Sequence, residues 1–169
     1  QNAGGVRVAL KAGDITYGNA NEVLPFSNML VNLSVTGKEV VATLEDAVEN
    51  ASFGQNGNKA STGAHPYADG LRWDLRLNQN KGNRVQNVEV RDRKTGTWAP
   101  IDLNKTYVMV TNDYIASGKD GYLSLAPIFK DPSRVEDTKL LYTQSLVDYI
   151  KKQATISLPA RSEYSHKSV

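Results

Sequence analysis

The sequence predicts a single domain of the mixed α/β class. A capping-box pattern at Thr36–Glu39 precedes apolar residues at helical spacing and predicts a helix over about residues 37–50. Strict alternation over residues 71–77 predicts a half-buried strand, and the apolar run at 107–110 predicts a buried one. Because the 169 residues are enough to bury one sizeable core, helices and strands in this chain indicate one domain.

The first part of the chain is predicted to contain a short helix, a strand and then the long helix. Thr16 can cap a helix that ends near Pro25, because the residue before a proline is biased against helical backbone. Alternation over residues 29–35 predicts a strand. The long helix places one group of apolar residues on a single face: Val40, Val41, Leu44, Ala47 and Val48. Residues 51–66 are rich in Gly, Asn and Ser and are expected to form a loop.

The middle of the chain is predicted to contain further strands. Gly82 marks a turn, residues 85–90 read as a strand, and residues 91–96 read as a polar hairpin turn. The apolar run at 107–110 then delivers Thr111–Asp113 at its carboxyl end. Such strand ends are common positions for ligands in sheets flanked by helices.

A final helix is predicted over about residues 138–153, with Asp137 as its capping residue. Three apolar residues would then face inward: Leu140, Val147 and Ile150. The polar segment from residue 159 onward is expected to be extended or loose.

Composition limits the chemistry that this chain can perform. The chain has no cysteine and a net charge of only +2, so thiolate chemistry is excluded and a nucleic-acid partner is not indicated. It has no apolar run of membrane-spanning length. His65 lies in a Gly/Asn-rich stretch and His166 in a polar tail, which favours two surface histidines over a metal site. No nucleophile and base set is recognisable, so we expect neither a metal nor another cofactor in this chain.

Three segments together point to a nucleotide-binding site: residues 2–7, 22–28 and 111–122. In the first, Arg7 offers a planar fork of donors that suits phosphate oxygens, and the glycines let the backbone approach a ligand. The aromatic residues Phe26 and Tyr114 in the other two segments could hold a flat base between them. Taken singly, each feature has a plainer explanation as a turn, a surface arginine or a core aromatic residue.

The order and spacing of these segments resemble the carboxy-terminal domain of the 5'-nucleotidase family, which includes UDP-sugar hydrolases and NAD nucleotidases. The resemblance covers nearly the whole chain, so residues 1–169 are interpreted as one such domain. The stretches that carry it are 2–7 (Asn-Ala-Gly-Gly-Val-Arg), 13–16 (Gly-Asp-Ile-Thr), 22–26 (Glu-Val-Leu-Pro-Phe), 61–63 (Ser-Thr-Gly), 111–114 (Thr-Asn-Asp-Tyr) and 118–122 (Gly-Lys-Asp-Gly-Tyr).

The resemblance implies a division of labour within a longer protein. It implies an α+β type of fold with mixed sheets and flanking helices in α/β/β/α layers. An amino-terminal metallophosphoesterase domain, absent here, would carry two divalent metal ions and the catalytic residues and would be the partner of this domain. We therefore expect this chain to be truncated at its amino terminus, inactive alone, and part of a periplasmic, cell-surface or secreted hydrolase of nucleoside 5'-monophosphates.

The resemblance also implies roles for individual residues at the phosphate and the base. Asn2 and Arg7 would contact the scissile phosphate. Phe26 and Tyr114 would stack on the two faces of the base, and Asn28 would hydrogen-bond to its edge.

Two further residues are implied at the base and the sugar. The backbone of Gly63 would approach the base, and Asp120 would accept hydrogen bonds from the ribose hydroxyls. The sequence departs from the family pattern at Lys119, which replaces a glycine and would be strained if that position needs a positive φ. For Asp120, a carboxylate in a glycine-flanked turn can also serve the turn itself.

Other functions remain open at this point. The full protein could instead cleave NAD or a nucleotide sugar, and the domain could be a nucleoside-binding or adhesive module without catalysis. Because stacking tolerates any base, the sequence does not rank purines against pyrimidines.

Overall fold

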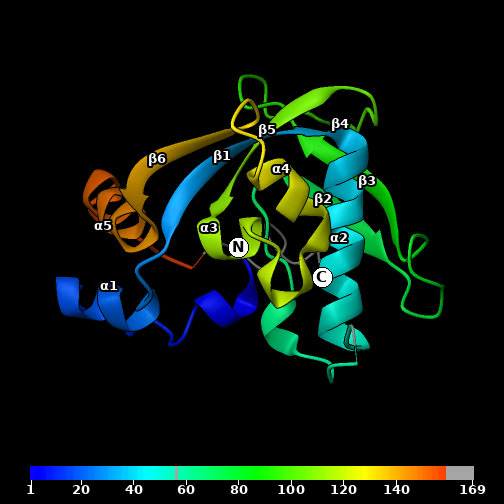
Figure 1. The fold of residues 1–169 in the computed structure, drawn as a ribbon. Coiled ribbons are helices and arrows are strands. Elements are labelled where there is room, and N and C mark those ends of the chain that lie inside the picture. Colours follow the sequence, from blue (N-terminus) through cyan, green and yellow to red (C-terminus); the bar gives the residue numbers. More distant parts are fainter. Residues whose placement is uncertain (56, 159–169) are drawn as a thin grey trace.

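The computed structural model describes residues 1–55 and 57–158 (Figure 1). The predicted polar segment from residue 159 and His166 lie outside the described residues. The strands are β1 (Met29–Thr36), β2 (Leu71–Leu75), β3 (Val85–Arg91), β4 (Trp98–Pro100), β5 (Thr106–Asn112) and β6 (Val135–Leu141). The α-helices are α1 (Tyr17–Val23), α2 (Gly37–Ser52), α3 (Asp113–Ala116), α4 (Ala126–Phe129) and α5 (Tyr142–Gln153). Short 3-10 turns are η1 (Ala3–Gly5), η2 (Thr62–Ala64), η3 (Lys119–Gly121) and η4 (Leu123–Leu125).

Two three-stranded sheets and their helices confirm the predicted α/β class. One sheet has the order β5-β1-β6 and the other β2-β3-β4, and the neighbouring strands in both are antiparallel. The expectation of mixed sheets was therefore wrong, because each strand in the described residues pairs only with antiparallel neighbours. In the first sheet Leu33 lies opposite Met109 on one side and Val135 on the other. Helix α1 packs beside α5 (Figure 1).

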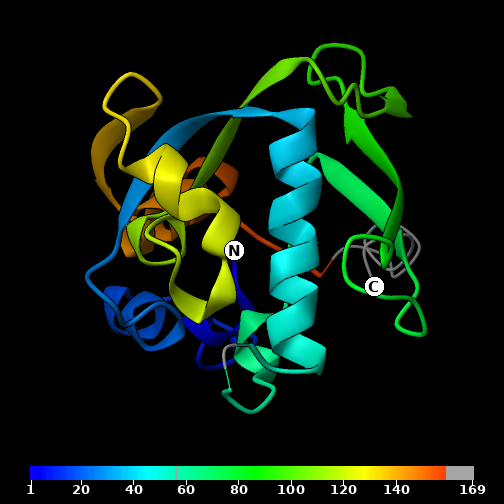
Figure 2. The ribbon, with the colours of Figure 1, turned by 45° about the vertical axis from the view of Figure 1, so that its right-hand side comes forward.

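Helix α2 lies between the two sheets (Figure 2). Its Val40, Ala47 and Ala51 join a core with Val31, Leu33 and Val35 of β1. A second side of the helix, through Leu44 and Val48, packs with Trp73, Val85 and Val88 of the other sheet. Burial therefore extends further around α2 than a one-sided apolar pattern predicts, and even Glu45 is buried, where its carboxylate accepts the N–H groups of Gly82 and Val85.

The predicted capping box begins α2. Thr36 Oγ1 accepts a hydrogen bond from the N–H of Glu39, whose carboxylate accepts from the N–H of Thr36. Arg134 donates to both oxygens of the same carboxylate, at 3.0 and 2.6 Å. These bonds, with that of Arg134 the strongest, lower the pKa of Glu39 to about 2. The predicted cap of α1 by Thr16 is confirmed as well.

Two predictions about strands and helices were wrong. Residues 135–141 form β6 because β1 offers them a hydrogen-bonding edge, so α5 begins at Tyr142 and Asp137 lies within a strand. The run at 107–110 is not buried on both sides, since Val108 is 72% exposed while Tyr107 and Met109 pack on the core. Strand β5 lies at the edge of its sheet, with one face open at these residues.

Three further elements differ from those expected. Strand β4 was not predicted, and the strand predicted over 71–77 ends at Leu75. The loop predicted over 51–66 contains the end of α2 and the turn η2. Within the described residues, no helix has both the length and the apolar character needed to cross a membrane.

Candidate functional site

All seven residues that the sequence singled out line one cavity of about 320 Å³. They come from four separate parts of the chain: η1 and the residues next to it, the loop after α1, η2, and the turn after β5. The residues in question are Asn2, Arg7, Phe26, Asn28, Gly63, Tyr114 and Asp120. Five more residues line the same cavity: Gly4, Gly5, Ser61, Asn112 and Tyr142.

Main-chain contacts hold the first residues of the chain against η2. Asn2 forms an isolated antiparallel bridge with Pro66, and the N–H of Ala3 donates to the carbonyl of His65 at 2.9 Å. A Cβ atom at Gly4 would lie 3.3 Å from the Cα of Gly63. This close approach of two backbones explains why glycine suits position 4.

The side chain of Asn2 forms hydrogen bonds within the protein. The residue is 3% exposed, and its Nδ2 donates to Oδ2 of Asp120 at 2.6 Å. Its Oδ1 accepts from Gln1 at 3.1 Å and from the buried Asn112 at 3.4 Å. The expected contact of Asn2 with phosphate stays a prediction, and its visible role is to connect the start of the chain to the turn that carries Asp120.

Asp120 lies at the centre of these contacts. Its Oδ1 accepts from the hydroxyl of Tyr114 at 3.2 Å, while its carbonyl accepts from Nδ2 of Asn50 at 2.8 Å. The backbone of Asp120 is left-handed, with φ of 51°. Gly118, which precedes η3, and Gly121, which ends it, also have positive φ. Lys119 is not among the positive-φ residues, so the strain considered for it does not arise, and it does not line the cavity.

The two aromatic residues on this cavity remain partly open to solvent. Phe26 is 46% exposed and Tyr114 is 42% exposed. Neither ring is therefore a core residue, which was the plainer explanation for each. Burial, followed by the charge of Asp120, raises the pKa of Tyr114, so its hydroxyl remains a neutral donor at physiological pH.

Arg7 and Asn28 each use part of their polar groups inside the protein. The N–H of Arg7 donates to the carbonyl of Val23 at 2.9 Å, and its exposed guanidinium makes a 3.3 Å bond to the carbonyl of Gly4. Nδ2 of Asn28 donates to the carboxylate of Asp113 at 2.7 Å. Arg7 is thus anchored through its backbone while its charge stays at the surface of the cavity.

The sequence interpretation missed Tyr142 and Asn112. Asn112 is the N-cap of α3, and its Oδ1 accepts a hydrogen bond from the N–H of Ile115. Because α3 has only four residues, it shows no helical periodicity in the sequence, and its cap was not predicted. Tyr142 was assigned to the interior of a predicted helix, whereas it is the first residue of α5 and its hydroxyl reaches Phe26 and Gly5. The Asn-Asp pair at the junction of β5 and α3 was the one available signal for a cap.

Metal-binding groups do not gather in the part of the chain that the structure describes. No three His, Asp or Glu side chains there are placed to hold an ion together. His65 packs edge-on against Tyr67, 5.1 Å between ring centroids, and burial lowers its pKa. His65 is a packing residue and does not line the cavity.

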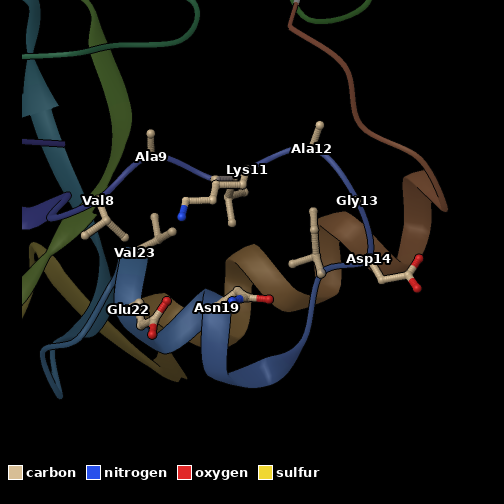
Figure 3. A pocket seen from close by; sticks show the side chains of 11 residues that line it. Val8, Ala9, Lys11, Ala12, Gly13, Asp14, Asn19, Glu22 and Val23 are labelled. Carbon is tan, nitrogen blue, oxygen red and sulfur yellow. The ribbon is translucent and has the colours of Figure 1, made fainter.

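A second cavity of about 480 Å³ lies between residues 8–15 and α1 (Figure 3). Lys11, Asn19 and Glu22 lie around it, and Asp14 points away from it (Figure 3). It has no aromatic lining residue and shares none with the first cavity. The first cavity is therefore the better candidate for a site that binds a base.

Comparison with known proteins identifies the domain. Residues 1–127 match the family model described as the 5'-nucleotidase C-terminal domain. The chain is 40% identical over 154 residues to the NAD 5'-nucleotidase of Haemophilus influenzae, covering 90% of this chain and 25% of that protein. It is 41% identical over 152 residues to a probable 5'-nucleotidase of Treponema pallidum, covering 89% of this chain and 24% of that protein.

Solved structures agree with the sequence matches. The structure of Haemophilus influenzae NAD nucleotidase superposes with a TM-score of 0.81 at 41% identity, covering 90% of this chain and 26% of that one. A 5'-nucleotidase precursor from Thermus thermophilus gives 0.79 at 36% identity, covering 94% and 29%. The chain spans about a quarter of the length of these relatives. It belongs to the family of 5'-nucleotidase C-terminal domains.

Proposed function

We propose that this domain binds the substrate of a 5'-nucleotidase, a nucleoside 5'-monophosphate, and directs its phosphate towards a hydrolytic centre elsewhere in the full protein. The observation that carries the proposal is the single cavity on which all seven expected residues meet. Family membership and the names of the relatives support the same activity.

The base would lie between Phe26 and Tyr114. Both residues line the cavity and both are partly exposed, which supports stacking of a base on their rings. A base stacked on both sides needs the two rings about 7 Å apart, which is two stacking spacings. Asn28 and the backbone of Gly63 line the same cavity and would complete the contacts to the base.

The ribose would lie against Asp120. Each carboxylate oxygen of Asp120 accepts one hydrogen bond from the protein, from Asn2 and from Tyr114. Each oxygen has two lone pairs, so a further hydroxyl donor can be accepted at both. The internal bonds would thus orient the carboxylate for the sugar without using its full capacity.

The phosphate would face Arg7. Its guanidinium is exposed at the cavity and has further N–H groups beyond the one that reaches Gly4. The described residues do not fit a metal site, so the two divalent ions implied by the resemblance would belong to the part of the protein outside this chain. In that division of labour Arg7 holds and neutralises phosphate, and the domain alone does not hydrolyse it.

A dinucleotide is the second candidate substrate. The Haemophilus influenzae relative is named an NAD 5'-nucleotidase. The same base, ribose and phosphate contacts would hold one mononucleotide half of NAD, and the other half would extend out of the cavity. In either case we place the full protein in the periplasm, at the cell surface or outside the cell.

The experiment that tests this proposal compares the full-length protein with the isolated domain. Phosphate release from AMP, NAD and UDP-glucose is measured with added divalent metal ions, and adenosine binding to the domain is measured by calorimetry. We expect only the full-length protein to hydrolyse these substrates. We expect both the full-length protein and the isolated domain to bind adenosine. Metal-dependent turnover by the isolated domain would contradict the division of labour, and adenosine binding without any turnover would favour a non-catalytic module.

A further inference from the structure

The hydroxyl of Tyr142 connects two of the loops that line the candidate site. It accepts a hydrogen bond from the N–H of Phe26 at 2.9 Å and donates to the carbonyl of Gly5 at 3.4 Å. Tyr142 is 2% exposed and lines the cavity. Its hydroxyl therefore joins the glycine loop that leads to Arg7 to the loop that carries the Phe26 ring.

The start of α5 also holds the Phe26 loop at two other points. The N–H of Tyr142 donates to the carbonyl of Asn28 at 3.0 Å, and the hydroxyl of Thr143 donates to the carbonyl of Leu24. Both loops are thus tied to the start of α5, the Phe26 loop at three points and the Gly5 loop at one. The bond to Gly5 is the contact through which this element reaches the phosphate side of the cavity.

The bridge needs a neutral hydroxyl, because only the protonated phenol can donate to Gly5 while accepting from Phe26. Burial raises the pKa of Tyr142, although the N–H of Phe26 and the charge of Arg7 act in the other direction. The hydroxyl therefore stays protonated throughout the physiological range.

We propose that Tyr142 is a positioning residue that sets the separation between the ring of Phe26 and the Gly5–Arg7 loop. The inference rests on the proposed function, in which these two groups hold the base and the phosphate of one nucleotide. If the hydroxyl is lost, each loop can still contact its own part of the ligand, but the spacing between the parts is no longer held. Turnover falls steeply when a reacting group is misplaced by a small distance, so the loss should appear mainly in kcat.

The test uses Tyr142→Phe in the full-length protein with two substrates. AMP needs both the base and the phosphate contacts, whereas p-nitrophenyl phosphate has no nucleobase or ribose. We expect kcat for AMP to fall about tenfold or more, while both kinetic constants for p-nitrophenyl phosphate stay within about twofold.

Tyr107→Phe is the matched control. The Tyr107 hydroxyl also accepts a main-chain N–H, that of Asp102 at 3.0 Å, and Tyr107 does not line this cavity. The control should leave the ratio of the two activities unchanged.

The possible results separate the hypotheses. An equal loss on both substrates, or no loss on AMP, would overturn the positioning role. A wild-type protein that hydrolyses p-nitrophenyl phosphate but no nucleotide would instead refute the proposed function on which the inference rests. If Tyr142→Phe does not fold, amide exchange in the wild type decides: we expect the Phe26 amide to be protected at least tenfold, and exchange at the unprotected rate would overturn the bridge.

Discussion

Nδ2 of Asn2 donates a 2.6 Å hydrogen bond to Oδ2 of Asp120, and so joins two residues that are 118 positions apart in the chain. The bond connects the glycine-rich start of the domain to the turn after α3. Because the second oxygen of Asp120 accepts from Tyr114, a proposed ribose acceptor and a proposed base-stacking residue are held in one network. Substitutions in this network must separate contacts to ligand from contacts within the protein.

Asp120→Ala should weaken binding of ribonucleotides by about 1–3 kcal/mol, the range for leaving polar groups unpaired. The same variant should weaken the binding of 2',3'-dideoxynucleotides only slightly, because these lack the hydroxyls that Asp120 would contact. The measurement is the KM for AMP and for its dideoxy analogue in the full-length protein. Asn2→Ala is a companion variant and not a neutral control, because it removes the internal bond and keeps the carboxylate, while Asn2 itself also lines the cavity. If Asp120→Ala loses as much with the dideoxy substrate, Asp120 serves the turn alone.

Phe26→Ala should raise the KM for AMP roughly tenfold, since stacking on one aromatic ring contributes about 1–3 kcal/mol per base. Tyr114→Phe is the informative partner, because it keeps the ring and removes the bond to Asp120. We expect less than a threefold change for Tyr114→Phe in steady-state assays. A loss in Tyr114→Phe as large as that in Phe26→Ala would mean that the hydroxyl, and not the ring, supports binding at this position.

Arg7→Ala should lower kcat for AMP by about 10²-fold with a smaller change in KM, because charge on the phosphoryl oxygens grows towards the transition state. Arg7→Lys should recover only part of this loss, since lysine keeps the charge but lacks the planar fork. Steady-state kinetics of both variants in the full-length protein provide the check. An unchanged kcat in Arg7→Ala would contradict the proposal that the phosphate lies against Arg7.

Glu39 should make the domain sensitive to acid. Its folded-state pKa of about 2 lies below the ordinary value of 4.5, so its stabilising contribution is complete above pH 4.5 and is lost as the pH falls towards 2. The ion pair with Arg134 is partly exposed, and solvent screening limits the effect to about 1–2 kcal/mol. In urea unfolding, the free energy of unfolding should differ less between pH 7 and pH 3 for Glu39→Gln than for the wild type. Equal differences would exclude Glu39 as a contributor.

Gly121→Ala should destabilise the domain much more than Gly57→Ala does. The two glycines have nearly equal φ, 81° and 79°, so the backbone strain of a side chain is matched. A Cβ at Gly121 would lie 2.6 Å from the Cβ of Asn50, whereas one at Gly57 meets no atom within 4 Å. In thermal or urea unfolding, we expect the free energy of unfolding to fall by about 1 kcal/mol for Gly57→Ala and by at least about 2 kcal/mol for Gly121→Ala. Equal costs would show that the turn moves to relieve the contact.

Local hydrogen-bond chemistry explains which elements could be predicted. The caps of α1 and α2 depend on side chains three residues apart, so Thr16, Thr36 and Glu39 were sufficient to identify them. Strand β6 could not be recognised in this way, because residues 135–141 form a strand by pairing with β1, a segment about a hundred residues away in the chain. The same dependence on a partner explains the missed β4, which pairs with β3.

The sequence by itself determined the α/β class, the capped helices and the residue types needed for a nucleotide site, because periodicity, capping and motif order are local properties of the chain. Only the tertiary structure decided that α2 is enclosed by two sheets, that Val108 is exposed, and how the site is held together. The bond between Asn2 and Asp120 and the bridge made by Tyr142 join segments more than a hundred residues apart. Such contacts depend on how strands pair and loops meet in space, which no local pattern in the sequence specifies.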